Sequence, residues 1–182
     1  MAQNFIWWLG QKIKTYGNYD TGHFMASVDS TTSHIHEGLG YSIGGSGTIP
    51  AAGYYAFLAL IGDTPLHFHG LKVKVDAGPV EIDLIESPTV VNAGTSTTPR
   101  NKNRLFTDSS GATVTYGAEI TGGTVIDPDD VLDIGGGSHT EGGEGGSTGE
   151  WVLKPNTYYA MKITGAQGTA FSAKFFYYEL DL

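Results

Sequence analysis

Alternation of apolar and polar positions dominates the chain from residue 22 onward. The clearest case is segment 66–86, where apolar residues alternate with charged ones on both sides of Asp76-Ala77-Gly78-Pro79. Folded as a hairpin about this turn, Val73 lies opposite Ile82, and lysines on the other face lie opposite acidic residues. The pattern therefore predicts a hairpin with its apolar face in the core and its charged face in water.

Similar alternation predicts seven more strands, separated by turns rich in glycine, proline, asparagine and threonine. They are His23–Val28, His36–Ile43, Tyr54–Leu60, Thr113–Ile120, Glu150–Leu153, Tyr158–Ile163 and Phe171–Leu182. The last strand carries apolar residues on both faces, which indicates cover on both sides, for example by a partner subunit. The expected fold is all-β, an antiparallel β-sandwich and within that class a jelly roll, with an N-terminal arm. The arm is assigned to residues 1–21 and the sandwich domain to residues 22–182.

The N-terminal segment 4–16 breaks this pattern, because its apolar residues fall near helical spacing. It predicts either a short amphipathic helix or an arm that docks on a neighbouring subunit, or a segment that packs on its own domain. The candidate interface residues here are Phe5, Trp7, Trp8 and Leu9. The lysines follow the apolar run, whereas a signal peptide begins with its basic residues. We therefore expect the chain to be unprocessed and made in the cytoplasm.

Composition excludes several function classes. The chain of 182 residues has 10 basic and 19 acidic side chains, a net charge of −9, and no cysteine. Binding to nucleic acid is not expected, because phosphate neutralisation needs positive charge. No window is long and apolar enough to predict a membrane span, and disulfide or thiolate metal sites are impossible. Residues 135–149, rich in glycine and acidic, predict an exposed loop.

Candidate metal and catalytic motifs are incomplete. His34–His36 and His67–His69 have the H-x-H spacing of a cupin metal site on a strand, but neither is followed by a properly spaced carboxylate. The acidic cluster 127–133 lacks the residue order of a calcium loop and predicts a solvated loop. No nucleophile-elbow or H-E-x-x-H motif is present. We expect no enzyme activity, no catalytic residue, no cofactor and no bound metal.

Two further pairs of residues are candidates for contacts between subunits. Arg100 and Arg104, the only arginines, flank Asn101-Lys102-Asn103. Arginine makes bidentate contacts with carboxylates and is favoured at interfaces, although pairing with an acidic loop of the same subunit is an equal alternative. Phe176 and Tyr178 lie on the second face of the last strand and complete the candidate interface.

Short motifs follow one another in a distinctive order along residues 34–180. They are Ile35-His36-Glu37-Gly38, Leu66-His67-Phe68, Glu86-Ser87-Pro88-Thr89-Val90, Gly94-Thr95, Asn101-Lys102-Asn103-Arg104, the glycine-rich acidic loop, Glu150–Tyr159 and Tyr177-Tyr178-Glu179. This order resembles a family of small structural proteins of tailed bacteriophages that decorate or cement the head. The first 33 residues lie outside the resemblance.

The resemblance implies a β-sandwich that sits on the capsid exterior of the virion as a homo-oligomer and bridges capsomers. Its expected partners are the major capsid protein and copies of itself, with no nucleic acid and no membrane. Two alternatives remain open. One is a tail or fibre protein that binds a host glycan, with Tyr54, Tyr55 and Trp151 stacking on sugars. The other is a cupin-like metal enzyme built on the H-x-H pairs.

Overall fold

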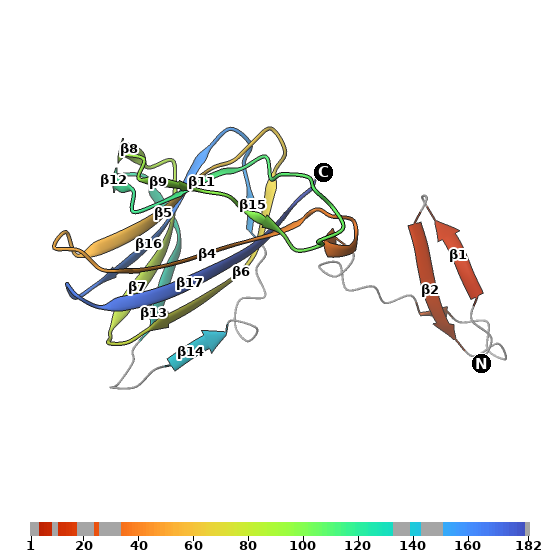
Figure 1. Ribbon diagram of the computed structural model, residues 1–182, viewed down its shortest axis with the longest axis horizontal. Helices are drawn as coiled ribbons and strands as arrows, with labels where there is room; N and C mark the ends of the chain where they lie inside the picture. The colour runs from red at the N-terminus through yellow and green to blue at the C-terminus, as the bar shows by residue number, and fades with distance from the viewer. Residues whose placement is uncertain are drawn as a thin grey trace.

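The protein is described by a computed structural model that covers residues 4–8, 11–17, 24–25, 34–132, 139–142 and 151–180. Side chains are described for residues 34–126 and 151–180. Nearly all regular structure in these ranges is β, and the strands pair antiparallel. The predicted antiparallel β-sandwich is therefore confirmed (Figure 1).

The first large sheet has the order β10-β4-β17-β6-β14, and β15 also pairs with β6. Its strands are β4 (Gly40–Thr48), β6 (Leu66–Val75), β10 (Arg100–Asn101), β14 (His139–Gly142), β15 (Trp151–Leu153) and β17 (Ala170–Glu179). The central strand β17 runs between β4 and β6 along almost its whole length.

The second large sheet has the order β13-β7-β16-β5-β11-β9. Its strands are β5 (Tyr54–Leu60), β7 (Val80–Glu86), β9 (Thr95–Thr97), β11 (Thr113–Tyr116), β13 (Thr124–Leu132) and β16 (Tyr158–Gly165). Two shorter strands, β8 (Thr89–Asn92) and β12 (Glu119–Thr121), pair with each other. The remaining strands are β1 (Asn4–Trp8), β2 (Gln11–Gly17) and β3 (Phe24–Met25).

One hydrophobic core fills the space between the two large sheets. It draws alternate residues from β4, β6 and β17 on one side and from β5, β7 and β16 on the other. Phe57 of β5 meets Phe175 and Phe171 of β17 edge to face, with ring centroids 4.8 and 6.2 Å apart. Burial of such large aromatic side chains is the main source of stability for a sandwich of this kind.

A second, smaller core lies on the outer face of the second sheet. Ala56, Leu58, Ile85 and Ala160 point outward from that sheet and pack against Ala118 and Ile120. Tyr54 attaches β12 to the second sheet, because its hydroxyl donates a hydrogen bond to the carbonyl of Ile120 and accepts one from the amide of Ile120. The β8–β12 pair therefore acts as a third layer over β5, β16 and β7.

The predicted hairpin within 66–86 is wrong. The residues of this segment form β6 and β7, which belong to different sheets: Val73 pairs with Ala173 and Ile82 pairs with Ile163. Both Val73 and Ile82 are buried in the main core, which they enter from opposite sides. Alternation correctly predicted that Val73 and Ile82 face the core. However, the same alternation is expected whether the two strands pair within one sheet or face each other across the core.

Several predicted boundaries also need correction. The amphipathic helix within 4–16 is wrong, because β1 and β2 pair as antiparallel strands there. Residues 34–36 form a helical turn, so the predicted strand His36–Ile43 begins only at Gly40. The predicted strand Thr113–Ile120 is divided into β11 and β12, with Gly117 at a positive φ between them.

Two segments predicted as loops contain strands. Residues Asp127–Asp130 of the acidic cluster belong to β13, which pairs with β7 through two register shifts. Within the predicted loop 135–149, His139–Gly142 form β14 along Lys72–Val75, and the rest of that loop lies outside the described residues. In each case an edge strand supplies backbone hydrogen bonds, which do not require an apolar sequence pattern.

The chain crosses between the large sheets at β4 to β5, β5 to β6, β6 to β7, β9 to β10, β10 to β11, β13 to β14, β15 to β16 and β16 to β17. The jelly-roll topology, the N-terminal arm and the domain boundary at residue 22 stay predictions. The candidate functional surface is the outer face of β10, β4, β17 and β6, beside the turn at residues 34–36.

Candidate functional site

Basic side chains gather on the outer face of the first sheet. Six of the chain's 10 basic residues come from β6, β10, the segment after β10, and β17; these are Lys72, Lys74, Arg100, Lys102, Arg104 and Lys174. Antiparallel pairing aligns them in rows. Arg100 and Phe176 both pair with Ser42, and in the neighbouring row Lys72 and Gly44 both pair with Lys174. A net charge of −9 therefore coexists with a locally cationic face.

Three of these lysines surround the ring of Phe176. Their Nζ atoms lie 4.9 Å (Lys102), 5.2 Å (Lys174) and 5.9 Å (Lys72) from the ring centroid. Cation–π attraction holds each amine near the ring. Burial lowers the pKa of Lys102 below its ordinary value, and repulsion from Lys174 and Lys72 lowers it further. The ring thus organises three like charges that repel one another.

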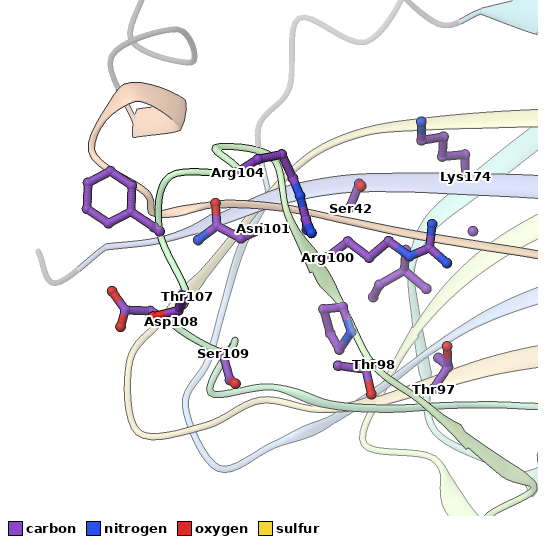
Figure 2. Close-up of a pocket in the computed structure, with 14 residues that line it drawn as sticks. Ser42, Thr97, Thr98, Arg100, Asn101, Arg104, Thr107, Asp108, Ser109 and Lys174 are labelled. Atoms are coloured by element: carbon purple, nitrogen blue, oxygen red, sulfur yellow. The ribbon is translucent and has the colours of Figure 1, made fainter.

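A polar groove of about 770 Å³ continues this face toward the sheet edge. Arg100, Arg104 and Lys174 line it, and Figure 2 shows these three cationic side chains around one opening. The floor includes Ser42 and Gly44 of β4, whose small size leaves room above the sheet. The opposite wall is the segment Thr107–Ser109, with the carboxylate of Asp108.

The cations of the groove and of the lysine cluster around Phe176 form no ion pair among the described side chains. None of Arg100, Arg104, Lys72, Lys102 or Lys174 forms an ion pair with a carboxylate in that part of the structure. Elsewhere, by contrast, Lys154 pairs with Glu86 at 2.7 Å. Clustered like charges that no ion pair neutralises destabilise the free protein and are stabilised when an anion binds.

The segment after β10 is fixed to the turn at residues 34–38. Asn101 donates from Nδ2 to the carbonyl of Gly38 at 2.6 Å, and Asn103 donates from Nδ2 to the carbonyl of His36 at 3.0 Å. The ring of Phe106 lies directly on Gly38, where a Cβ atom would stand 2.5 Å from it and φ is +80°. Only glycine satisfies both conditions at low cost.

This fixed segment exposes one apolar side chain. Leu105 is 91 % exposed, although its amide donates to Oδ1 of Asn103 at 3.1 Å. We call residues 101–106 the pinned loop. Hydrogen bonds of Asn101 and Asn103 hold the pinned loop before Leu105, and the ring of Phe106 packs on Gly38 directly after it, so that leucine is presented in a defined place.

The candidate interface residues lie in different surroundings. Arg100 and Arg104 come together at the groove, and Phe176 lies beneath the three lysines. Tyr178 is 5 % exposed and stacks on His34 and His67, at centroid distances of 4.4 and 4.7 Å, so its cover comes from its own chain. Side chains of Phe5, Trp7 and Trp8 in β1, and the whole of Leu9, lie outside the described residues.

The two H-x-H pairs do not present paired imidazoles. His34 and His36 belong to the helical turn, and His67 is buried whereas His69 is exposed, beside a register shift in β6. Among the described residues, no three histidine, aspartate or glutamate side chains are grouped as metal ligands would be. His34 and His67 instead each stack on the ring of Tyr178.

The aromatic residues considered for sugar stacking do not share a surface. Tyr54 packs against the smaller core, whereas Tyr55 and Trp151 pack against the main core. Sequence reasoning found Arg100 and Arg104, but it missed Lys72, Lys102 and Lys174 as their neighbours. Only the strand order β10-β4-β17-β6 brings these side chains together, and no spacing in the sequence carries that order.

Comparisons with protein-family models, with curated proteins and with solved structures find no match for this chain. Within the described residues, no helix has the length and apolar character needed to cross a membrane.

Proposed function

We propose that this protein is a structural component of a virion that decorates the outer surface of a bacteriophage capsid and stabilises it by bridging capsomers. The order of motifs along residues 34–180 supports this proposal, and the pinned loop is the structural observation that carries it. The protein acts by binding rather than catalysis, and its partners are the major capsid protein and copies of itself.

The pinned loop has the properties of a docking element. An exposed leucine contributes about 1.5–3 kcal/mol when a partner buries it. Ordering a flexible loop on binding would consume part of that gain, but Asn101 and Asn103 have already ordered this one. Arg104 stands beside Leu105 and supplies a charge-assisted contact at the rim.

Decoration of a shell needs only modest affinity per contact. Many copies on one lattice each add a contact across a seam, so the summed free energy opposes the outward pressure of packaged DNA. The N-terminal segment, with Phe5, Trp7, Trp8 and Leu9, is proposed to reach a neighbouring subunit and add a second contact per copy. A position on the virion exterior also suits a net charge of −9, which disfavours binding to DNA.

The test uses purified full-length protein and heads assembled without it. Sedimentation should show saturable binding of the wild type to heads, and a reconstruction of the particles should place it on their outer surface in many copies. Leu105→Ser should weaken binding about tenfold or more, because it removes the anchor. Val91→Ser, which changes a residue 64 % exposed on β8, is the matched control and should bind like the wild type.

Two outcomes would contradict the proposal. Binding confined to tails or fibres would favour the alternative of a host-glycan receptor protein. Equal binding of wild type and Leu105→Ser to heads would remove the pinned loop from the interface.

A further inference from the structure

We propose that the basic groove binds an acidic polysaccharide, that is, a chain of sugars bearing carboxylate groups. This proposal does not depend on where the protein sits in a virion. It rests on three features of the groove: the arrangement of its cations, its hydroxyl lining and its continuation along the outer face of the sheet.

The cations of the groove are suited to carboxylates. Arg100 and Arg104 face one opening with Lys174, and a guanidinium group can hold a carboxylate through two parallel hydrogen bonds (Figure 2). Arg100 stands on a strand paired with β4, and Arg104 belongs to the pinned loop, so the backbone beneath each side chain is fixed. Neither arginine has a described carboxylate as partner.

The lining between the cations is suited to sugars. Five hydroxyl side chains border the groove, namely Ser42, Thr97, Thr98, Thr107 and Ser109. Hydroxyls both donate and accept hydrogen bonds, as sugar hydroxyls do. The carboxylate of Asp108 lies on the same wall and can only accept, so it favours a ligand that carries hydroxyl donors as well as anionic groups. A ligand with anionic groups alone would be repelled there.

The binding face extends beyond a single sugar. A volume of about 770 Å³ is within the range of sites that enclose a drug-sized ligand. Lys174 belongs both to the groove and to the cluster over Phe176, where Lys72 and Lys102 supply further positive charge. A polymer with a carboxylate on each sugar would meet the arginines and then the lysines in turn.

Other anionic polymers fit less well. The backbone of DNA carries phosphates but no free hydroxyl groups, so it offers no hydrogen-bond donor to Asp108 and no match to the hydroxyl lining. An acidic peptide anchors through apolar side chains as well as charges, and the groove lining offers chiefly hydroxyl and charged groups. The leucine of the pinned loop points to solvent and does not line the groove, so Leu105→Ser leaves the groove lining unchanged.

The experiment is calorimetric titration of the purified full chain with oligogalacturonate at low salt. Its fully methyl-esterified form has the same sugars without charge, and polyglutamate carries carboxylates on a peptide. We expect binding to oligogalacturonate, at least about tenfold weaker binding to the other two probes, and weakening by salt. The double variant Arg100→Gln, Arg104→Gln should lose about tenfold or more in affinity.

Two further variants test whether binding depends on the bidentate geometry of arginine or only on the charge of the protein. Arg100→Lys keeps the charge but cannot make the bidentate contact, so it should bind more weakly than the wild type. Lys154→Gln removes one charge that does not line the groove and should bind within about twofold of the wild type. Circular dichroism of each variant verifies the fold.

Three results would overturn the inference: no binding of the wild type to oligogalacturonate, equal binding of polyglutamate, or affinity unchanged in the double arginine variant. Its failure is distinguishable from that of the capsid proposal. Loss of head binding in Leu105→Ser alone concerns the pinned loop, whereas loss of saccharide binding in the arginine variants concerns the groove.

Discussion

At the scale of single residues, Glu179 stabilises the segment that directly follows the groove wall Thr107–Ser109. Its carboxylate accepts hydrogen bonds from the hydroxyl of Ser110 and from the amides of Gly111 and Ala112. Ser110 is also 2.8 Å from the hydroxyl of Tyr177. One side chain at the end of β17 therefore satisfies several donors of the segment that continues from Asp108.

Replacing Glu179 with alanine should destabilise the protein by about 1–3 kcal/mol, because part-buried donors then lose their acceptor. The free energy of unfolding, measured in urea, checks this value. Glu119→Ala in β12, an exposed site, is the control and should change stability by less than about 0.5 kcal/mol. Equal stability of both variants would mean that water replaces the carboxylate without cost.

The raised pKa of Tyr159 predicts that the folded protein loses stability in alkaline solution. Burial raises its pKa from 10.0 to about 12, and its hydroxyl donates to Glu86 at 2.7 Å. Between pH 10 and pH 12 the unfolded chain releases this proton whereas the folded chain keeps it, so stability falls as pH rises. Tyr159→Phe should lessen the slope of the unfolding free energy against pH over this interval, and urea unfolding at a series of pH values between 10 and 12 checks this.

At the scale of elements, the β8–β12 pair stabilises the sandwich from outside. Ile120 is 7 % exposed and fills the smaller core together with Leu58 and Ile85. The two strands belong to neither large sheet, so side-chain packing and the hydrogen bonds of Tyr54 attach them. This third layer covers apolar residues that would otherwise face water.

Ile120→Ala should therefore destabilise the protein by about 2–4 kcal/mol, through lost burial and the cavity that remains. Val91→Ala, in the paired strand β8 but exposed, should cost less than about 0.5 kcal/mol. Thermal or urea unfolding compares the two. A small effect of Ile120→Ala would show that the layer contributes little to the fold.

At the scale of the whole molecule, the described side chains of both cores come from one continuous part of the chain. Every buried hydrophobic residue among the described side chains lies between Tyr41 and Tyr178. Deleting residues 1–16 should therefore leave a cooperatively unfolding domain with a midpoint close to that of the full chain, while head binding becomes weaker. A truncated chain that is unfolded would place this segment in the core, and normal decoration would remove its proposed role.

The candidate site was only partly predictable. The close spacing of Arg100 and Arg104 identified a cationic point in an acidic chain. Lys72, Lys102 and Lys174 lie far apart in sequence and meet because β17 separates β6 from β4 and because Asn101 and Asn103 fix the segment after β10. The cover of Tyr178 by His34 was likewise unpredictable, since a turn outside the strands provides it.

Alternation along the sequence is enough to predict the all-β class and which apolar residues face inward, because side chains alternate between the two faces of a strand whatever its partner. The pairing partners of the strands, in contrast, follow from the tertiary structure. Val73 and Ile82 were correctly predicted to be buried, yet they meet the core from opposite sheets rather than as a pair. Alternation specifies a face, whereas hydrogen bonding joins any two extended backbones. Strand order is therefore chosen by the packing of the complete core, and the groove exists only in that order.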